Sequence, residues 1–403
     1  MRPVTSRHPC ATGKVWTLRW GKWLAPLCLL GLLGCAPLRG HESWLVLLDA
    51  GAGAAPSRLK QVSAPPTRTP VSYTVDGRSH TADLYLPGAG AAAAAIVLVP
   101  GAVPHGKDDA QLVAFAQTLA RARFAVLAPE LTGLRQLRLH PGAAREVADA
   151  VVYLASRADL APAGRVGIAA FSYAVGPALL AALEPDVRDQ LRFILGVGGY
   201  HDLARTVSYF TTGRFPHEGR WYALEPNPYG QLVFAKTSLP YLSAPDRALL
   251  ERMVELRLQD RSADIAPLAP GLGPPGAAVH ALLSNTDPTR VAQLLAALPA
   301  PLGADIAALS LHDKDLAGLK ARLILLHGKN DNLIPFPQSI ALAAAVPPGQ
   351  ARLFLINRLL GHVDLSLGHL LSWQFLSREL PDAWRLWRAV DALLAERAPD
   401  ADR

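Results

Sequence analysis

The pattern of apolar and polar positions predicts strands from Val71 onward. Val71 to Val75 and Thr81 to Leu86 alternate apolar and polar residues around the turn Asp76-Gly77, which is typical of an antiparallel hairpin. Later runs are apolar throughout, as in strands buried on both faces of a sheet. These runs predict strands at Ala94 to Val99, Phe124 to Ala128, Val166 to Phe171, Phe193 to Val197, Leu323 to Leu326 and Leu353 to Ile356.

Segments with helical periodicity lie between and after these strands. They are Gln111 to Ala122, Gly142 to Arg157, a helix from about Tyr173, Pro337 to Ala345, and a long amphipathic helix from Leu370. A hairpin followed by strand–helix repeats predicts an α/β fold with a mostly parallel central sheet and helices on both faces. Ligands of such sheets bind beyond the carboxyl ends of the strands, so polar residues just after strands are the candidates for a site.

The stretch from Tyr200 to about Leu319 breaks this rhythm. It contains helical segments, such as Ala244 to Leu258 and Thr289 to Leu298, that are separated by proline and glycine. At roughly 120 residues it is too long for a simple connection. It predicts a helical lid inserted at residues 201–318, which divides the core into residues 71–200 and 319–403.

One match to a cofactor motif lies in this insertion. Gly271-Leu-Gly-Pro-Pro-Gly276 has the letters of a dinucleotide-binding fingerprint. No predicted strand precedes it, and its two prolines argue against a helix after it. We therefore expect no cofactor, and the sequence offers no candidate metal ligands.

Composition and charge exclude a nucleic-acid partner. Half of the 403 residues are hydrophobic, enough for a large core, and the formal net charge is +7. Residues 1–34 hold five basic residues and no acidic ones, so the 35 basic and 33 acidic residues that remain nearly balance. Nothing in that balance requires a polyanionic partner.

Residues 1–34 have the layout of an export signal, with a basic region before an apolar run from about Trp23 to Leu33. The uncharged stretch is about 16 residues long, short of the roughly 20 that a membrane-spanning helix needs. Its end, Leu32-Leu33-Gly34-Cys35, resembles the lipobox of bacterial lipoproteins, which implies cleavage before Cys35 and lipidation of its thiol. The alternatives are an ordinary signal for a periplasmic or secreted protein and an uncleaved membrane anchor.

The cysteine positions agree with this resemblance. All three cysteines lie within the first 35 residues, so a processed chain would keep only Cys35, where lipidation would occupy the thiol. Residues 35–70 are rich in Gly, Ala, Pro and Ser, and they predict a tether between the anchor and the folded core.

Ser172 stands on a predicted corner between the strand Val166 to Phe171 and the helix that follows. So abrupt a turn holds the corner residue in a strained backbone conformation. Ala170 and Ala174, two residues before and after, are small enough for strand and helix to approach closely. These are the requirements of a nucleophile elbow, although glycine is usual where this chain has alanine. The alternative is a serine that only caps a helix.

A serine nucleophile needs a base to accept its proton and a carboxylate to orient that base. Asp331 lies in the loop after the strand Leu323 to Leu326, and His362 lies in the loop after Leu353 to Ile356. The chain order Ser172, Asp331, His362 is the one such a sheet requires. Asp202 is an alternative acid, and His369 an alternative base.

With these residues the chain resembles the α/β-hydrolase superfamily over Val71 to Tyr200 and Leu319 to Glu396. The Pro100-Gly101 turn and the sequence around Asp331 resemble its dienelactone-hydrolase and esterase branches. The resemblance implies Ser172 as nucleophile, Asp331 as acid and His362 as base. It also implies an oxyanion hole made by the backbone N–H groups of Tyr173 and Ala102, with Val103 as the alternative to Ala102.

The resulting expectation is an esterase-like serine hydrolase that is anchored at the bacterial cell envelope through Cys35. Its partners would be a small acyl substrate and, through the anchor, the membrane. Tyr209, Phe210, Trp221, Tyr222 and Tyr229 are candidates to line an acyl pocket in the lid or to form the lid's own core. The alternative of another class is a non-catalytic binding or scaffold protein on the same fold.

Overall fold

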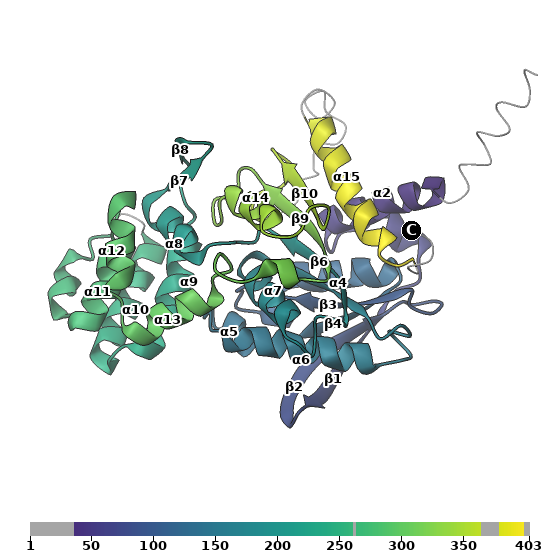
Figure 1. Cartoon of the computed structure of the whole chain (residues 1–403), viewed down its shortest axis with the longest axis horizontal. Coiled ribbons are helices and arrows are strands. Elements are labelled where there is room, and N and C mark those ends of the chain that lie inside the picture. The colour runs from purple at the N-terminus through teal and green to yellow at the C-terminus, as the bar shows by residue number, and fades with distance from the viewer. Residues whose placement is uncertain (1–35, 261–262, 364–378, 399–403) are drawn as a thin grey trace, which may run out of the picture. The chain divides into compact units, whose positions relative to one another are not determined.

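The computed structural model describes residues 36–260, 263–363 and 379–398. The chain divides into two compact units, Met1–Glu42 and Ser43–Arg403. The second unit contains all the strands that the structure describes, including a central eight-stranded sheet (Figure 1). The predicted signal at residues 1–34 and the predicted anchor at Cys35 lie outside the described residues.

An eight-stranded sheet forms the centre of the second unit. Its order is β1-β2-β4-β3-β5-β6-β9-β10, and all neighbours pair in parallel except β1 with β2 and β2 with β4. The strands are β1 (Thr67–Val75), β2 (Arg78–Leu86), β3 (Ala94–Val99), β4 (Phe124–Pro129), β5 (Val166–Phe171), β6 (Leu191–Val197), β9 (Arg322–Gly328) and β10 (Ala351–Ile356). The predicted mostly parallel sheet is confirmed, and every predicted strand is present.

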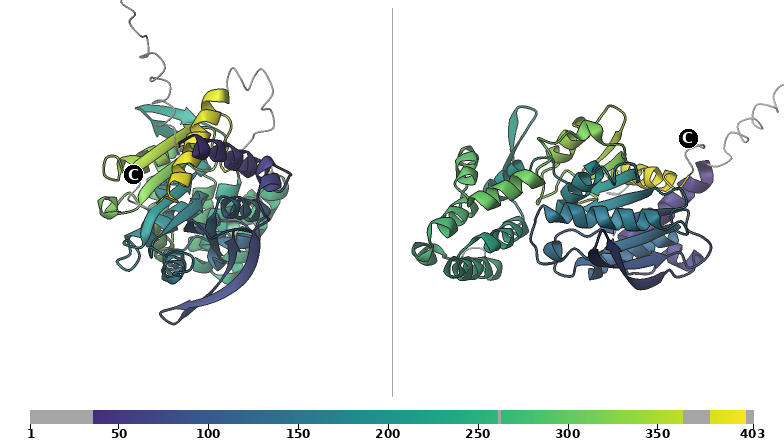
Figure 2. Two further views of the ribbon diagram at one scale, coloured as in Figure 1. Left: turned by 90° about the vertical axis from the view of Figure 1, so that its right-hand side faces the viewer. Right: turned by 60° about the horizontal axis from the view of Figure 1, so that its bottom comes forward.

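Helices cover both faces of the sheet (Figures 1 and 2). Successive residues of β3 point to opposite faces, so Val97 and Ile96 belong to two separate hydrophobic clusters. One cluster includes residues of α6 (Gly142–Ser156), α7 (Val175–Leu183) and α14 (Pro337–Ala344). The other includes residues of α3 (Arg58–Val62), α4 (Ala110–Arg121) and α15 (Leu380–Ala395). The start predicted for the last helix, Leu370, lies outside the described residues.

The prediction of a tether at residues 35–70 is wrong over most of that range. Residues Ala36–Ala52 form helix α2, Arg58–Val62 form α3, and β1 begins at Thr67. Val46, Leu47 and Leu59 are buried against the sheet cluster. The buried carboxylate of Asp49 accepts hydrogen bonds from Lys60 (2.5 Å) and from Thr118 of α4 (2.6 Å). A composition rich in alanine and glycine therefore conceals a packed helix, because a few apolar residues on one face are enough to fix it.

The insertion between β6 and β9 is mainly helical, as predicted. Its elements are α8 (Leu203–Thr212), β7 (Arg214–His217), β8 (Arg220–Ala223), α9 (Tyr229–Ser238), α10 (Ala244–Gln259), α11 (Pro274–Leu283), α12 (Val291–Ala296) and α13 (Ala300–Leu309). The β7–β8 hairpin was not predicted, because each strand has only four residues. It turns at Glu218 and Gly219, both with positive φ, which matches the twist of a tight hairpin.

Two further features of the insertion follow from its helix boundaries. Pro274 and Pro275 are the first residues of α11, so they begin a helix instead of excluding one. A 3₁₀ turn, not a strand, precedes them, so the dinucleotide motif remains without its strand. No single described helix is long and apolar enough to cross a membrane. Only the pair Pro288–Ala296 and Ala300–Leu309, bent by 118°, has the combined length and composition.

Candidate active site

Four neighbouring strands bring the candidate residues to one edge of the sheet. β5, β6, β9 and β10 are adjacent and parallel, so the loops at their carboxyl ends meet. Ser172 follows β5, Gly198 follows β6, Asp331 follows β9 and His362 follows β10. This arrangement gives each residue a place at the sheet edge where ligands of such folds bind.

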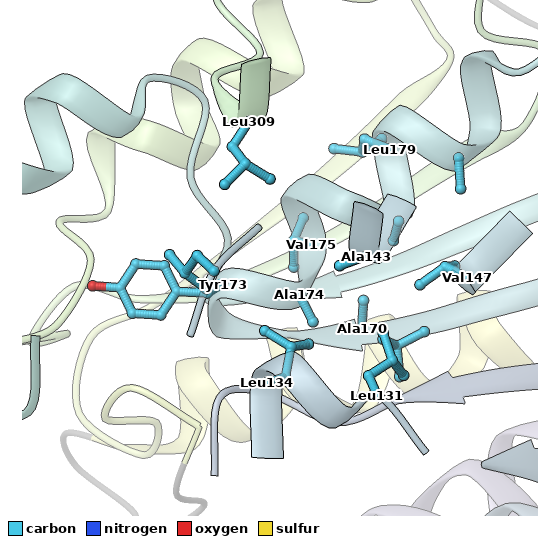
Figure 3. Close-up of a cluster of buried hydrophobic side chains, with 14 of the residues drawn as sticks. Leu131, Leu134, Ala143, Val147, Ala170, Tyr173, Ala174, Val175, Leu179 and Leu309 are labelled. Atoms are coloured by element: carbon cyan, nitrogen blue, oxygen red, sulfur yellow. The ribbon is translucent and has the colours of Figure 1, made fainter. Parts of the chain in front are cut away.

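Ser172 has the strained backbone that the sequence predicts. Its φ is +55°, one of few positive values among non-glycine residues in the described chain, and its side chain is buried. The chain passes from β5 through a 3₁₀ turn at Ser172–Ala174 into α7. Ala170 and Ala174 are fully buried and pack near Leu131 and Leu134 (Figure 3). Alanine therefore fits both positions where glycine is usual.

The carboxylate of Asp331 is buried and receives four polar contacts. Its Oδ1 accepts from the backbone N–H groups of Leu333 (2.8 Å) and Ile334 (2.9 Å). Its Oδ2 lies 2.6 Å from His362 Nδ1 and 3.2 Å from His327 Nε2. Burial alone would raise the pKa of Asp331, but attraction and hydrogen bonding from the two histidines hold that pKa below its ordinary value.

His362 is oriented by this contact. Its Nδ1 donates to Asp331, so its Nε2 is the nitrogen left to accept a proton. Nε2 is buried and has no hydrogen-bond partner among the described residues. Ser172 likewise has no side-chain hydrogen bond there, so no hydrogen bond joins the two. Hydrogen bonds between catalytic groups are often long until substrate binds. The lack of a Ser172–His362 hydrogen bond in this structure is therefore compatible with proton transfer between the two residues.

Three glycines allow this close packing. A Cβ on Gly198 would lie 3.0 Å from the His362 carbonyl and 3.3 Å from Asp331 Oδ2, and Gly198 already has φ +63°. A Cβ on the adjacent Gly199 would lie 2.5 Å from a methyl of Val175, in the helix after Ser172. A Cβ on Gly328 would overlap the Gly361 carbonyl at 2.2 Å. The loop that carries His362 therefore contacts the end of β9 directly. The residues just after β6 contact both the His362–Asp331 pair and the helix that follows Ser172.

Backbone donors lie on the other side of Ser172. A Cβ on Gly101 would come within 3.7 Å of Ser172 Cβ, so the loop after β3 runs beside the corner. The N–H groups of Tyr173, Ala102 and Val103 donate to no acceptor among the described residues. The structure thus leaves both predicted oxyanion donors, and the alternative Val103, without an internal acceptor.

The Ala102 carbonyl is held by the insertion. Tyr229, the first residue of α9, donates its hydroxyl to this carbonyl at 2.8 Å. Burial and nearby Asp109 raise the pKa of Tyr229 to about 12, so the hydroxyl stays protonated. A peptide carbonyl and the next N–H point in opposite directions, so this bond also fixes the direction of the Val103 N–H.

The alternative residues have other contacts. Asp202 caps α8 by accepting from the N–H of Arg205 (3.1 Å), so it serves a helix end. His369 lies outside the described residues. His327 is fully buried, with Nε2 donating to the Ile334 carbonyl (2.8 Å) and Nδ1 accepting from Ser339 (2.6 Å). It also contacts Asp331, so it supports the loop that carries the acid, as its position directly after the strand Leu323 to Leu326 predicts.

Asp382 contributes to the site in a way that the sequence pattern does not predict. Its buried carboxylate accepts from the N–H groups of Asn357 (2.9 Å) and Arg358 (2.8 Å), the first residues after β10. It therefore ties the loop that carries His362 to the start of α15. The only sequence signal was an acidic residue in the first turn of a helix, which is common for other reasons.

A narrow, mainly apolar cavity of about 20 Å³ lies between the corner and the insertion. It is lined by Tyr173 and by residues of α8, α9 and α13, among them Phe210 and Leu309. Figure 3 shows the Tyr173 ring extending away from the residues packed around α7. Burial raises the pKa of Tyr173, and its buried hydroxyl has no partner among the described residues. Of the predicted lining aromatics, Trp221 and Tyr222 are instead exposed on the β7–β8 hairpin.

Within the described ranges, no group of three His, Cys, Asp or Glu side chains is placed to hold a metal ion. The polar groups at the sheet edge are those of an acid–base pair and a hydroxyl. Groups of these types can carry out proton transfer and nucleophilic attack.

Comparison with known proteins supports the fold. No family model and no curated protein sequence matches the chain. A provisionally named hydrolase from Legionella pneumophila matches with a TM-score of 0.53 at 14% identity, over 85% of this chain and 94% of its own. A dienelactone hydrolase from Anabaena variabilis matches with a TM-score of 0.39 at 16% identity, over 79% and 97%. A 2,6-dihydroxy-pseudo-oxynicotine hydrolase gives 0.45 at 15%, over 81% and 69%.

These likenesses are similarities in structure at low sequence identity. Together with the strand order, the similarity to the Legionella protein shows that the chain has the α/β-hydrolase fold. The fold by itself does not fix a substrate or a reaction.

Proposed function

We propose that the protein is a serine hydrolase that cleaves a carboxylic ester through an acyl-enzyme intermediate. The observation that carries this proposal is the 2.6 Å contact of His362 Nδ1 with Asp331, at the same sheet edge as a strained Ser172. An oriented histidine with a free Nε2 is what a serine hydroxyl needs in order to become a nucleophile. A helix cap needs neither partner.

Acylation begins when His362 Nε2 takes the Ser172 proton while the serine oxygen attacks the acyl carbonyl. Asp331 stabilises the imidazolium that forms. The carbonyl oxygen becomes negatively charged and accepts hydrogen bonds from the N–H groups of Tyr173 and Ala102, or Val103 in place of Ala102. The tetrahedral intermediate then collapses, His362 protonates the leaving alkoxide, and the alcohol departs.

Deacylation repeats these steps with water. His362 takes a proton from a water molecule, whose oxygen attacks the acyl-serine carbonyl, and the same backbone donors bind the oxyanion. Collapse returns the proton from His362 to the Ser172 oxygen and releases the carboxylic acid. Each backbone donor would contribute about 100- to 1000-fold to the rate, so loop placement matters beside the triad.

The helical insertion is proposed to act as a lid that shapes the acyl pocket. The small apolar cavity beside Tyr173 favours a short, uncharged acyl group over a long chain. A series of p-nitrophenyl esters tests this, with kcat/KM expected to be highest for acetate to butyrate. A maximum of kcat/KM at acyl chains of ten or more carbons would contradict the proposed preference for short acyl groups and leave the hydrolase proposal in place.

The catalytic test is labelling with a fluorophosphonate, which reacts with activated serines. We expect the full chain to be labelled, Ser172→Ala to be unlabelled, and the exposed control Ser284→Ala to be labelled like the wild type. Thermal unfolding of each variant shows whether the fold is kept. A folded wild-type chain that does not label, or a labelled Ser172→Ala, favours the second candidate. That candidate is a non-catalytic binding or scaffold protein on the same fold.

The proposed location is the bacterial cell envelope, with a lipid on Cys35 as the anchor. The support is the Leu32-Leu33-Gly34-Cys35 sequence at the end of an export-like segment. Globomycin should block processing of the wild-type chain, and Cys35→Ser should not be processed at this site. Processing that neither globomycin nor Cys35→Ser changes would favour an ordinary export signal, and a chain that is never processed would favour an uncleaved anchor.

A further inference from the structure

Three tryptophan rings form a stack at the surface beside the start of the folded unit. Trp387 of α15 lies between the other two, with its ring centroid 6.2 Å from that of Trp44 and 4.5 Å from that of Trp384. Both pairs are nearly parallel, at 26° and 21°. Trp384 is 52% exposed and Leu380, one turn before it, is 50% exposed. We call Trp44, Trp384, Trp387 and Leu380 the tryptophan surface.

The inner rings of the tryptophan surface pack against buried residues of the folded unit. Trp44 and Trp387 pack on the buried cluster that joins α15 to the sheet, so the outer Trp384 rests on fixed rings. Leu380, Trp384 and the exposed Arg388 recur every four residues and so share one face of α15. The result is a rigid apolar face with a basic residue on the same stripe.

The position of the tryptophan surface in the sequence indicates its binding partner. Trp44 follows Cys35 by nine residues, a separation that cannot exceed about 32 Å even in a fully extended chain. If Cys35 carries a lipid, the tryptophan surface is held within that distance of a bilayer wherever residues 1–42 lie. A second copy of the chain has no comparable reason to be close.

We propose that the tryptophan surface docks on the phospholipid bilayer that holds the anchor, an inference that rests on the proposed lipidation of Cys35. Tryptophan is enriched at the membrane interface, since its ring is apolar and its N–H can reach polar headgroups. Arg388 suits an anionic headgroup. One acyl group or one apolar face binds a membrane weakly, and two such contacts together hold much more firmly.

Docking through this face would set the orientation of the hydrolase unit. Within residues 43–403, the helical insertion extends beyond one end of the strands, whereas α15 packs over the sheet away from it, as Figure 1 and the right-hand view of Figure 2 show. A bilayer against α15 therefore need not cover the insertion. The substrate would enter from the aqueous side, not from the membrane.

The test uses the full chain, purified from membranes and reconstituted in phosphatidylethanolamine–phosphatidylglycerol vesicles with brominated acyl chains, which quench tryptophan fluorescence. We expect quenching in the wild-type chain and at least about a twofold smaller quenched signal in Trp384→Ala, because the outer ring makes the deepest contact. The matched control is Trp221→Ala, which removes a 60% exposed tryptophan from the β7–β8 hairpin of the insertion. This control should keep the wild-type quenched signal.

Equal quenching in the two variants would overturn the proposal. Failure of acrylamide to quench Trp384 without vesicles would also overturn it, since protein would then cover the surface already. A Trp384-dependent dimer seen by light scattering, with no quenching by lipid, would assign the face to a second copy.

Cys35→Ser separates docking from anchoring. The vesicle arm uses Cys35→Ser at mature length, without residues 1–34, because an unprocessed chain would keep the apolar run Trp23 to Leu33. This form should bind at least about tenfold more weakly than the reconstituted wild type, and Trp384→Ala should still reduce the quenching of its bound fraction. Unchanged processing of Cys35→Ser would refute the lipid anchor alone. Loss of the Trp384 effect would refute the docking alone, and fluorophosphonate labelling reports on the catalytic proposal independently of both.

Discussion

The acid–base side of the candidate site differs from its nucleophile side in how fully its polar groups are hydrogen bonded. Asp331 receives four polar contacts, from two backbone N–H groups and two histidines. On the nucleophile side, the Ser172 hydroxyl and the N–H of Tyr173 have no hydrogen-bond partner among the described residues, and His362 Nε2 has none there either.

In the proposed mechanism, this difference separates the groups that orient His362 from the groups that react. A buried polar group without a partner costs about 1–3 kcal/mol, so a group of them at one sheet edge is consistent with a ligand that later supplies the bonds. Saturation on the acid side fixes one tautomer of His362. The unpaired groups on the other side are those that the proposed mechanism assigns to substrate.

Asp331→Asn breaks the saturated side and should have the largest effect. An asparagine amide can donate to His362 Nδ1, which would stabilise the wrong tautomer and leave Nε2 protonated. We expect kcat to fall about 10⁴-fold while KM changes little. Steady-state hydrolysis of p-nitrophenyl acetate measures this loss.

Asp202→Asn is the matched control, since this acid caps α8 instead of contacting His362. Its kcat should stay within about twofold of the wild-type value, because asparagine also caps helices. A larger loss from Asp202→Asn than from Asp331→Asn would show that the acid had been assigned to the wrong residue.

Gly198→Ala shifts the oriented pair without removing any polar group. The new Cβ would press on the His362 carbonyl and on Asp331 Oδ2. A displacement of about 1 Å in such a pair can cost about 100-fold, and a smaller one costs less, so we expect kcat to fall roughly 10- to 100-fold. Gly349→Ala imposes the same kind of backbone strain at φ +84°, but its Cβ meets no atom within 4 Å. Both variants should lose about 1 kcal/mol of stability. Equal kcat values would contradict the steric explanation.

The contrast between the two sides should also appear in acid. The pKa of Asp331 is lower in the folded protein than its value of about 3.8 in the unfolded chain, so folding favours the ionised form. Its contribution to stability is complete above about pH 5 and is lost as the pH falls through 3.8 toward the folded-state pKa. Urea unfolding between pH 4 and pH 3 should therefore show a slope smaller by up to about 1.4 kcal/mol per pH unit in Asp331→Asn. Ser172→Ala, on the side without a titrating acid, should keep the wild-type slope.

The central strands and the order of the site residues could be predicted because local sequence determines them. Ala94–Val99 and Val166–Phe171 begin and end where their apolar runs do. A residue just after a parallel strand is brought to the sheet edge by the topology alone, which placed Asp331 and His362 together. The strained φ of Ser172 followed from its small neighbours.

What could not be predicted depends on contacts between distant segments. The composition of residues 36–52 is that of a linker and predicts a tether, and only the burial of Val46 and Leu47 against the sheet reveals the helix. Asp382 meets the loop after β10 from 25 residues away. Tyr229 was a candidate for a pocket or lid core, and no pattern indicated that its hydroxyl reaches the loop after β3.

Tyr229→Phe tests whether the unpaired donors depend on the insertion. The variant keeps the ring but removes the hydroxyl that donates to the Ala102 carbonyl, so the peptide that leads to the Val103 N–H loses its support. One hydrogen bond contributes about 0.5–1.5 kcal/mol, so we expect kcat to fall about 2- to 10-fold, with KM affected less. Tyr73→Phe is the control, because the buried Tyr73 hydroxyl, on β1 at the far edge of the sheet, has no partner in the described part of the chain and its removal should leave kcat unchanged. If Tyr229→Phe raises KM and leaves kcat intact, Tyr229 contacts substrate directly. If it changes neither, the donors are held by the core alone, and the insertion only covers the site.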